Sequence, residues 1–205
     1  MGAHKLGREM AAGLQAEGIV TALIDSNWHN VSQARMAGLT AYYGNAYAEY
    51  TFDEIDFNGI GRFLALTGNA EANALASLHF ADIFGRAEVY HLATPGDVGD
   101  NERKKTPLHL NGRVLFGSQL TYVYLTERIE AGDVLKATRL TDNFDFDDYQ
   151  IVHPQAIPLF LLKNKKTLFV FTAEGVLTPL PGDLVFSFTP KTAPERIKQN
   201  KAADI

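Results

Sequence analysis

The sequence predicts an α/β protein, in which a parallel sheet covered by helices is followed by a small α+β domain. Over residues 2–94, short apolar runs alternate with amphipathic stretches, as is typical of a parallel sheet with helices on its faces. A polar, turn-rich segment follows at residues 95–107. Beyond it the pattern changes to one helix and several strand-like runs, so we expect a second domain there.

The first half divides into four expected strands and four expected helices. The strands are expected at residues 20–24, 39–43, 63–67 and 88–92, and the helices at 6–17, 28–37, 46–57 and 70–84. Gly18, Gly38 and Gly85 stand where a left-handed residue ends a helix, and Asn27 and Asn69 stand where a side chain caps the first amides. We therefore assign residues 1–94 to one domain.

The second half is expected to be a small α+β domain over residues 108–190, with a polar tail at 191–205. A helix is expected at 118–131, and strands at 134–140, 157–162, 167–172 and 184–188. Asn164, Lys165 and Lys166 indicate a hairpin turn. The sequence Pro181-Gly182-Asp183 (181–183) indicates a turn that leads into the last strand.

Composition narrows the functional class. The chain is 46% apolar and 21% charged, which is ordinary for a globular protein. It has no cysteine, so disulfides and thiol chemistry are excluded and a cytoplasmic location is expected. The net charge is −5, and the only dense basic runs, 103–105 and 163–166, are short. We therefore expect no nucleic acid partner, because binding to phosphate backbones requires a basic face.

The segment from Gly2 to Gly7 has the spacing of a dinucleotide-binding turn, with His4 in place of the middle glycine. In a Rossmann-type fold, such glycines allow a tight turn, a close approach to phosphates and close packing of the following helix. Asp25 ends an apolar run about 20 residues further on, where this fold places a carboxylate for the ribose hydroxyls. The sequence therefore predicts a Rossmann-type nucleotide site.

The same residues suggest which nucleotide would bind. A carboxylate at Asp25 repels a ribose 2′-phosphate, which disfavours NADP(H). The β-carbon of His4 narrows the approach to a pyrophosphate, so AMP, ADP and ATP remain alternatives to NAD(H). A different interpretation is that Gly2, Gly7 and Asp25 are a turn, a packing glycine and a helix cap in a fold that binds nothing.

A Rossmann sheet has a central strand immediately before its glycine turn, and Met1 alone cannot supply it. We therefore expect a truncated first strand, with a gap or an exposed edge in the sheet. On this interpretation the chain is a fragment, or the product of a gene start placed too late, and the native polypeptide extends upstream.

Several segments resemble known regulatory domains. Residues 2–7, 23–27, 43–46 and 64–69 resemble the N-terminal domain of regulators of potassium conductance, the Trk-type nucleotide-binding (RCK) domains. The second half resembles their companion C-terminal domain. Residues 38–45 and 76–90 are similar to the cytoplasmic tail of bacterial sodium/proton antiporters.

The resemblance implies a nucleotide-sensing regulatory domain of a monovalent cation/proton antiporter or a potassium transport system, at the cytoplasmic face of the membrane. NAD(H), AMP, ADP or ATP would bias transport, the partner would be a membrane antiporter domain of the same or an associated polypeptide, and the domain would form a homodimer. By position, the phosphates would be lined by Gly2, His4, Lys5 and Gly7, the ribose by Asp25 with Ser26 and Asn27, the adenosine by Asn45 and Ala46, and the opposite lip by Thr67, Gly68 and Asn69.

An NAD-dependent oxidoreductase is the first alternative, and it would need a proton donor. None of the eight tyrosines has a lysine four positions later, and the histidines show no partner arrangement. We therefore assign no catalytic residue. Asp145, Asp147 and Asp148 lack the glycine and terminal Glu of a Ca²⁺ loop, so we expect a strand edge or loop there and no metal site.

The second alternative is a structural dimerisation module that has lost its ligand. Residues 46–57 and 70–84 both carry aromatic and apolar side chains beyond what one buried helix face needs. These stripes would serve a subunit interface. If these aromatic and apolar side chains only pack on their own sheet, they do not indicate a subunit interface.

Overall fold

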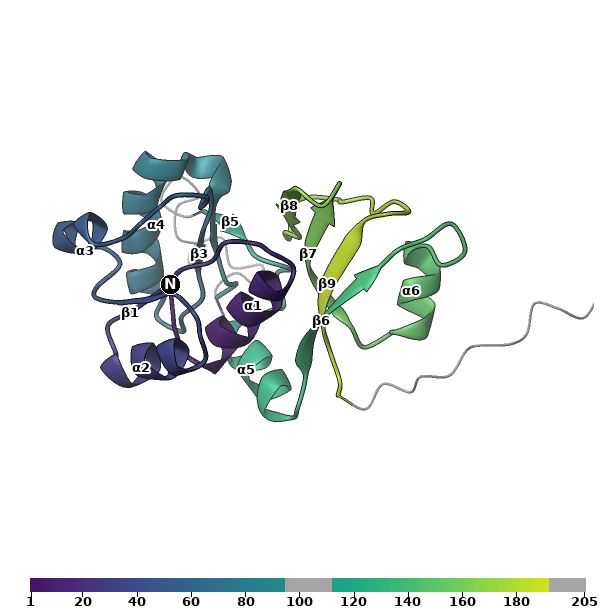
Figure 1. Cartoon of the computed structure of the whole chain (residues 1–205), viewed down its shortest axis with the longest axis horizontal. Helices are drawn as coiled ribbons and strands as arrows, with labels where there is room; N and C mark the ends of the chain where they lie inside the picture. The colour runs from purple at the N-terminus through teal and green to yellow at the C-terminus, as the bar shows by residue number, and fades with distance from the viewer. Residues whose placement is uncertain (95–111, 192–205) are drawn as a thin grey trace, which may run out of the picture.

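The computed structural model describes residues 1–94 and 112–191. Figure 1 shows a parallel α/β part and an antiparallel sheet on opposite sides of helix α1. This arrangement confirms the predicted fold class. The expected linker at 95–107 and nearly all of the expected tail lie outside the described residues.

The parallel part contains short strands that alternate with helices. Its elements are α1 (Lys5–Ala16), β1 (Leu23–Asp25), α2 (Trp28–Met36), β2 (Ala41–Tyr43), α3 (Glu49–Asp53), β3 (Phe63–Ala65), α4 (Ala70–Phe84), the 3₁₀ turn η1 (Arg86–Glu88), β4 (Val89–His91) and β5 (Arg113–Val114). β1 pairs with β2, and β3, β4 and β5 form a second set in that order, all in parallel.

The backbone of Met1 and Gly2 lies between these two sets of strands. The Gly2 amide donates to the Ile24 carbonyl at 2.8 Å. The Met1 amine donates to the Leu64 carbonyl at 2.7 Å, and the Leu66 amide donates to the Met1 carbonyl at 3.1 Å. The backbone of these two residues thus connects β1 with β3.

Most helix ends follow the predicted signals. Asn27 accepts a hydrogen bond from the His29 amide at 2.9 Å, and Asn69 accepts one from the Ala72 amide at 2.8 Å. Gly18, Gly38 and Gly85 all have positive φ angles. These residues therefore act as the caps that the sequence predicts.

The helix expected at residues 46–57 is much shorter, because only Glu49–Asp53 is helical. At its start the Asn45 side chain accepts from the Tyr47 amide at 3.3 Å, and after its end the Asp56 side chain accepts from the Asn58 amide at 2.9 Å. Such local bonds compete with the helix. Phe57 lies against Phe80 and Phe84 of α4 instead of continuing the turn.

The second part contains a helix that packs beside α1, followed by a four-stranded antiparallel sheet in the order β6-β9-β7-β8. Its elements are α5 (Tyr122–Glu130), β6 (Val134–Arg139), α6 (Phe146–Val152), β7 (Ile157–Lys163), β8 (Thr167–Val170) and β9 (Leu184–Thr189). Asn164 and Lys165 have positive φ and form the β7–β8 hairpin turn.

The prediction of a loop or strand edge around Asp145 is wrong, because α6 forms there. The Asp145 side chain accepts from the Asp148 amide at 2.9 Å, and the Asp148 side chain accepts from the Asp145 amide at 3.4 Å. This is a capping box built from two aspartates. Tyr149 of α6 is fully buried and anchors the helix on the sheet.

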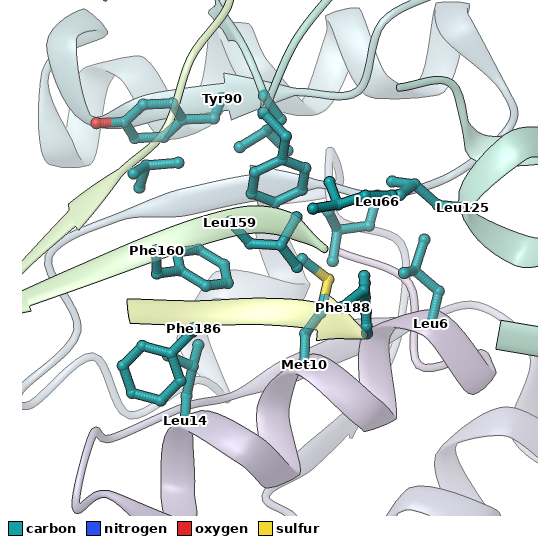
Figure 2. Close-up of a cluster of buried hydrophobic side chains, with 14 of the residues drawn as sticks. Leu6, Met10, Leu14, Leu66, Tyr90, Leu125, Leu159, Phe160, Phe186 and Phe188 are labelled. Atoms are coloured by element: carbon teal, nitrogen blue, oxygen red, sulfur yellow. The ribbon is translucent and has the colours of Figure 1, made fainter. Parts of the chain in front are cut away.

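The largest hydrophobic cluster is shared by the two parts of the chain (Figure 2). Its members include Leu6, Met10 and Leu14 of α1, Leu66 and Tyr90 of the parallel part, Leu125 of α5, Leu159 and Phe160 of β7, and Phe186 and Phe188 of β9. A β-carbon on Gly13 of α1 would lie 2.4 Å from a methyl carbon of Leu135 in β6. Helix α1 therefore packs closely on the antiparallel sheet, and a domain division at 95–107 stays a prediction.

Candidate functional site

The predicted site residues lie at the carboxyl ends of β1, β2 and β3 and at the start of α1. Asp25 ends β1 and is followed by Ser26 and Asn27, Asn45 and Ala46 follow β2, and Thr67, Gly68 and Asn69 follow β3. In parallel sheets this edge is where ligands bind, next to the strand order reversal. The fold therefore brings the predicted residues to one edge.

The glycine turn packs directly against α1. Gly2 has φ +102°, which favours glycine. A β-carbon on Gly7 would lie 2.0 Å from the Gly2 carbonyl oxygen. The close approach of helix and turn therefore requires glycine at position 7.

Asp25 connects the glycine turn to the start of α2. One carboxylate oxygen accepts from the Ala3 amide at 2.8 Å and from Asn30 Nδ2 at 3.0 Å, and the other accepts from the Asn27 amide at 2.8 Å. A carboxylate offers about four acceptor positions. Half-buried Asp25 thus holds the loop together and keeps about one position for a ligand hydroxyl.

The His4 side chain is turned toward β3 and α5. Its Nε2 lies 2.9 Å from the Leu66 carbonyl, and its Nδ1 lies 3.5 Å from the Gly7 amide. Since the carbonyl accepts and the amide donates, the ring is neutral with its proton on Nε2. Burial is the main cause that lowers the pKa of His4 from its ordinary value, partly opposed by the Leu66 hydrogen bond. The ring also meets Tyr122 edge-on, with centroids 5.0 Å apart.

The start of α1 retains unpaired amides. The Gly7 amide reaches His4, whereas the amides of Lys5 and Leu6 find no acceptor among the described residues. Amides at the first turn of a helix favour anions. The Lys5 ammonium points elsewhere, because it donates to the Ile129 carbonyl of α5 at 3.3 Å.

The opposite lip is held by hydrogen bonds at the start of α4. The Thr67 hydroxyl donates to Asn73 Oδ1 at 2.6 Å, and Asn73 Nδ2 donates to the Thr67 carbonyl at 2.8 Å. A β-carbon on Gly68 would lie 2.9 Å from the Tyr122 ring. This lip is therefore fixed between α4 and the start of α5.

The loop after β2 contributes less than predicted to an exposed site. The Gly44 amide donates to the Asp25 carbonyl at 3.1 Å, which holds the two strand ends together. The Asn45 side chain is used in the local turn. Ala46 is only 3% exposed and belongs to the hydrophobic cluster with Ile24.

Sequence reasoning missed several residues around this edge. Tyr122 contacts both His4 and Gly68, and no sequence signal could show a contact across more than 50 positions from either residue. Trp28 and Tyr43 form an exposed aromatic pair with centroids 5.6 Å apart, and Tyr43 is in register with Asp25. Tyr43 ends an expected strand and Trp28 begins the expected helix that follows the neighbouring strand, so the pair could have been found.

The described residues limit the chemistry at this edge. Within residues 1–94 and 112–191, no three His, Asp or Glu side chains gather as metal ligands, and no helix is long and apolar enough to cross a membrane. The arrangement offers free helix amides, a carboxylate acceptor and exposed aromatic rings. These groups suit binding of an anionic ligand with hydroxyls and a planar ring.

Comparison with known proteins finds a family match for the N-terminal part of the chain. A model of the TrkA-N domain family matches residues 1–95. No curated protein is significantly similar to the chain. Two solved structures are among those that the chain matches. One is the GsuK RCK domain, with TM-score 0.32 and 9% identity over 84% of this chain and 44% of that one. The other is the GsuK channel bound to NAD, with TM-score 0.36 and 12% identity over 89% of this chain and 34% of that one. The chain thus spans less than half of either, and residues 1–95 are similar to a TrkA-N domain.

Proposed function

We propose that the chain binds an adenine nucleotide at the carboxyl ends of β1, β2 and β3 and regulates a cation transport system. The observation that carries the proposal is the meeting of the glycine turn with Asp25, through the 2.8 Å bond from the Ala3 amide. Phosphates would meet the amides of Lys5 and Leu6, and a ribose hydroxyl would donate to Asp25. The TrkA-N similarity supports the same class of function.

NAD(H) or an adenosine phosphate is the proposed ligand. A 2′-phosphate on the ribose would lie against the Asp25 carboxylate, so NADP(H) is expected to bind at least tenfold more weakly, about 1.4 kcal/mol. Tyr43 is in register with Asp25 on the neighbouring strand, and its exposed ring meets that of Trp28.

The transport context is the finer part of the proposal. The resemblance of residues 38–45 and 76–90 to antiporter tails supports a membrane antiporter domain of the same or an associated polypeptide as the partner. A potassium transport system is the other member of the same class. In either case the domain would lie at the cytoplasmic face of the membrane and act as a homodimer.

Trp28 offers a direct assay, because it is the only tryptophan in the chain. Titration with NAD⁺, NADH, AMP, ADP, ATP and NADP⁺ should change its fluorescence, and saturating ligand should raise Tm. Asp25→Asn should weaken binding, whereas Asp53→Asn, an exposed carboxylate on α3, should not.

One observation favours a second candidate, a module that binds no nucleotide. Asp25 already has three partners within the protein, as a purely structural carboxylate would. If none of the six nucleotides alters fluorescence or Tm, this second function replaces the first.

A further inference from the structure

The backbone of Met1 and Gly2 divides the carboxyl edge of the parallel strands into two sides. Asp25 lies on the β1 side, and Leu66 and Thr67 lie on the β3 side. In a Rossmann-type fold, a dinucleotide crosses this edge with its pyrophosphate at the glycine turn and the start of the following helix. One nucleoside then lies on each side of the turn, whereas a mononucleotide needs only the turn and one side.

The β1 side of the edge is open and has the groups for one nucleoside phosphate. Asp25 is half-buried, and the following residues Ser26 and Asn27 are exposed. The amides of Lys5 and Leu6 at the start of α1 find no acceptor among the described residues. A ribose hydroxyl on Asp25 and a phosphate on these two amides would therefore fill this side.

The β3 side is occupied by two aromatic rings. The His4 Nε2 lies 2.9 Å from the Leu66 carbonyl, and the His4 ring meets the Tyr122 ring edge-on, with centroids 5.0 Å apart. Tyr122 also lies against the backbone at Gly68, where an added β-carbon would lie 2.9 Å from the ring. Both rings thus stand next to the turn, on the side where the second nucleoside of a dinucleotide would lie.

The start of α5 holds Tyr122 at this edge. The preceding residue, Thr121, forms a parallel bridge with Ala93, just beyond the end of β4. The Thr121 side chain also caps α5 by accepting from the Tyr124 amide at 3.3 Å. These contacts fix the backbone of Tyr122 over the carboxyl ends of β3 and β4.

The His4 ring is held by both of its nitrogens. Besides the contact with Leu66, its Nδ1 lies 3.5 Å from the Gly7 amide, so that His4 also caps α1. A ligand that displaced the ring would leave the carbonyl of buried Leu66 and the Gly7 amide without these partners. Losing one such hydrogen bond corresponds to about tenfold in affinity. The Gly7 amide is also closed to a second phosphate while His4 accepts from it.

We propose that His4 and Tyr122 select an adenosine mononucleotide, AMP or ADP, and exclude dinucleotides such as NAD(H). This selection rests on the proposed function and narrows its ligand to the smaller of the two classes. An adenosine with one or two phosphates fits within the β1 side and the turn, whereas the second nucleoside of NAD(H) would overlap the His4 and Tyr122 rings. Selection by such a clash requires no additional contact with the favoured ligand.

A series of ligands can locate the boundary. Dissociation constants are measured by isothermal titration calorimetry for AMP, ADP, ADP-ribose and NAD⁺, in which each ligand adds one group to the one before. ADP-ribose and NAD⁺ should bind the parent chain at least about tenfold more weakly than AMP. The loss should occur between ADP and ADP-ribose, because the second ribose is the first group to meet the rings.

Two variants remove one ring each. His4→Gly and Tyr122→Ala should each lower the ratio of the NAD⁺ and AMP dissociation constants at least about threefold, because each opens part of the β3 side. Tyr124→Ala is the matched control and should keep the ratio of the parent chain. Its exposed ring lies on the same helix but is engaged by Arg128.

The outcomes separate the selection from nucleotide binding itself. A parent chain that binds NAD⁺ as tightly as AMP would overturn the exclusion of dinucleotides and leave the proposed nucleotide site intact. An unchanged ratio in both variants would overturn the role of the two rings. Variants that bind neither ligand would do the same, because the rings would then be needed for binding as such. If no ligand of the series binds the parent chain, the proposed function falls and the selection falls with it.

Discussion

Replacing Asp25 with alanine is expected to lower the free energy of unfolding by about 2–3 kcal/mol. The change removes the acceptor of three hydrogen bonds, from the amides of Ala3 and Asn27 and from Asn30 Nδ2. Ala3 is fully buried, so its amide would lose its partner without gaining water, whereas Asn27 is exposed and can be rehydrated. The buried amide therefore accounts for most of the loss.

Urea unfolding measures this loss directly, and for a chain of this size it corresponds to a fall in Tm of roughly 5–10 °C. Asp25→Asn keeps one acceptor oxygen and should lose less, and the exposed Asp53→Ala should stay within about 0.5 kcal/mol of the parent. If Asp25→Ala unfolds at the same urea concentration as Asp53→Ala, the three hydrogen bonds that Asp25 accepts do not stabilise the fold.

Three further predictions follow from the same structure. Gly7→Ala should lower the free energy of unfolding by about 1–3 kcal/mol, because the new β-carbon meets the carbonyl of the glycine turn. Gly61→Ala is the control and should change stability little, because the space around Gly61 is open. Equal unfolding midpoints for the two variants would contradict this prediction. The free energy of unfolding should fall as pH drops from 8 to 5, because the folded state lowers the pKa of the Met1 amine to about 5 and the unfolded chain then binds more protons. Three pKa units correspond to at most about 4 kcal/mol, and to less for a residue that is partly exposed, as Met1 is. N-terminal acetylation should remove most of this dependence on pH. The lowered pKa of His4 should add to the loss below pH 6.5, so stability that is flat over this range would refute both assignments. The chain should be a dimer in light scattering, and Tyr50→Glu, on an exposed ring of α3, should yield monomer; a parent that is monomeric at high concentration would rule the dimer out.

The local part of the fold was predictable because the signals are local. Asn69 and Gly85 bracket α4, and the structure begins and ends that helix at the expected residues. The helix at 146–152 escaped prediction because its apolar face is short and its two aspartates look like a loop. The long helix expected at 46–57 failed because the aromatic residue Phe57 packs on α4 rather than along its own helix.

The candidate site was predictable in its parts and less so in its assembly. Asp25 was identified from its separation in sequence from the glycine turn. Its hydrogen bonds with Ala3, Asn27 and Asn30 could not be predicted, because they depend on side-chain orientation. The placement of Tyr122 depends on how the second part of the chain docks, and no periodicity in the sequence encodes that. Ligand binding at this edge stays a prediction.

Helix α1 touches each part of the protein at a glycine. At Gly7 its backbone meets the glycine turn, and at Gly13 it meets Leu135 of the antiparallel sheet. Packed interiors shift between discrete arrangements and do not deform gradually. A small movement of the glycine turn would therefore shift helix α1 as a unit. Because α1 also contacts Leu135 closely at Gly13, the shift would reach β6.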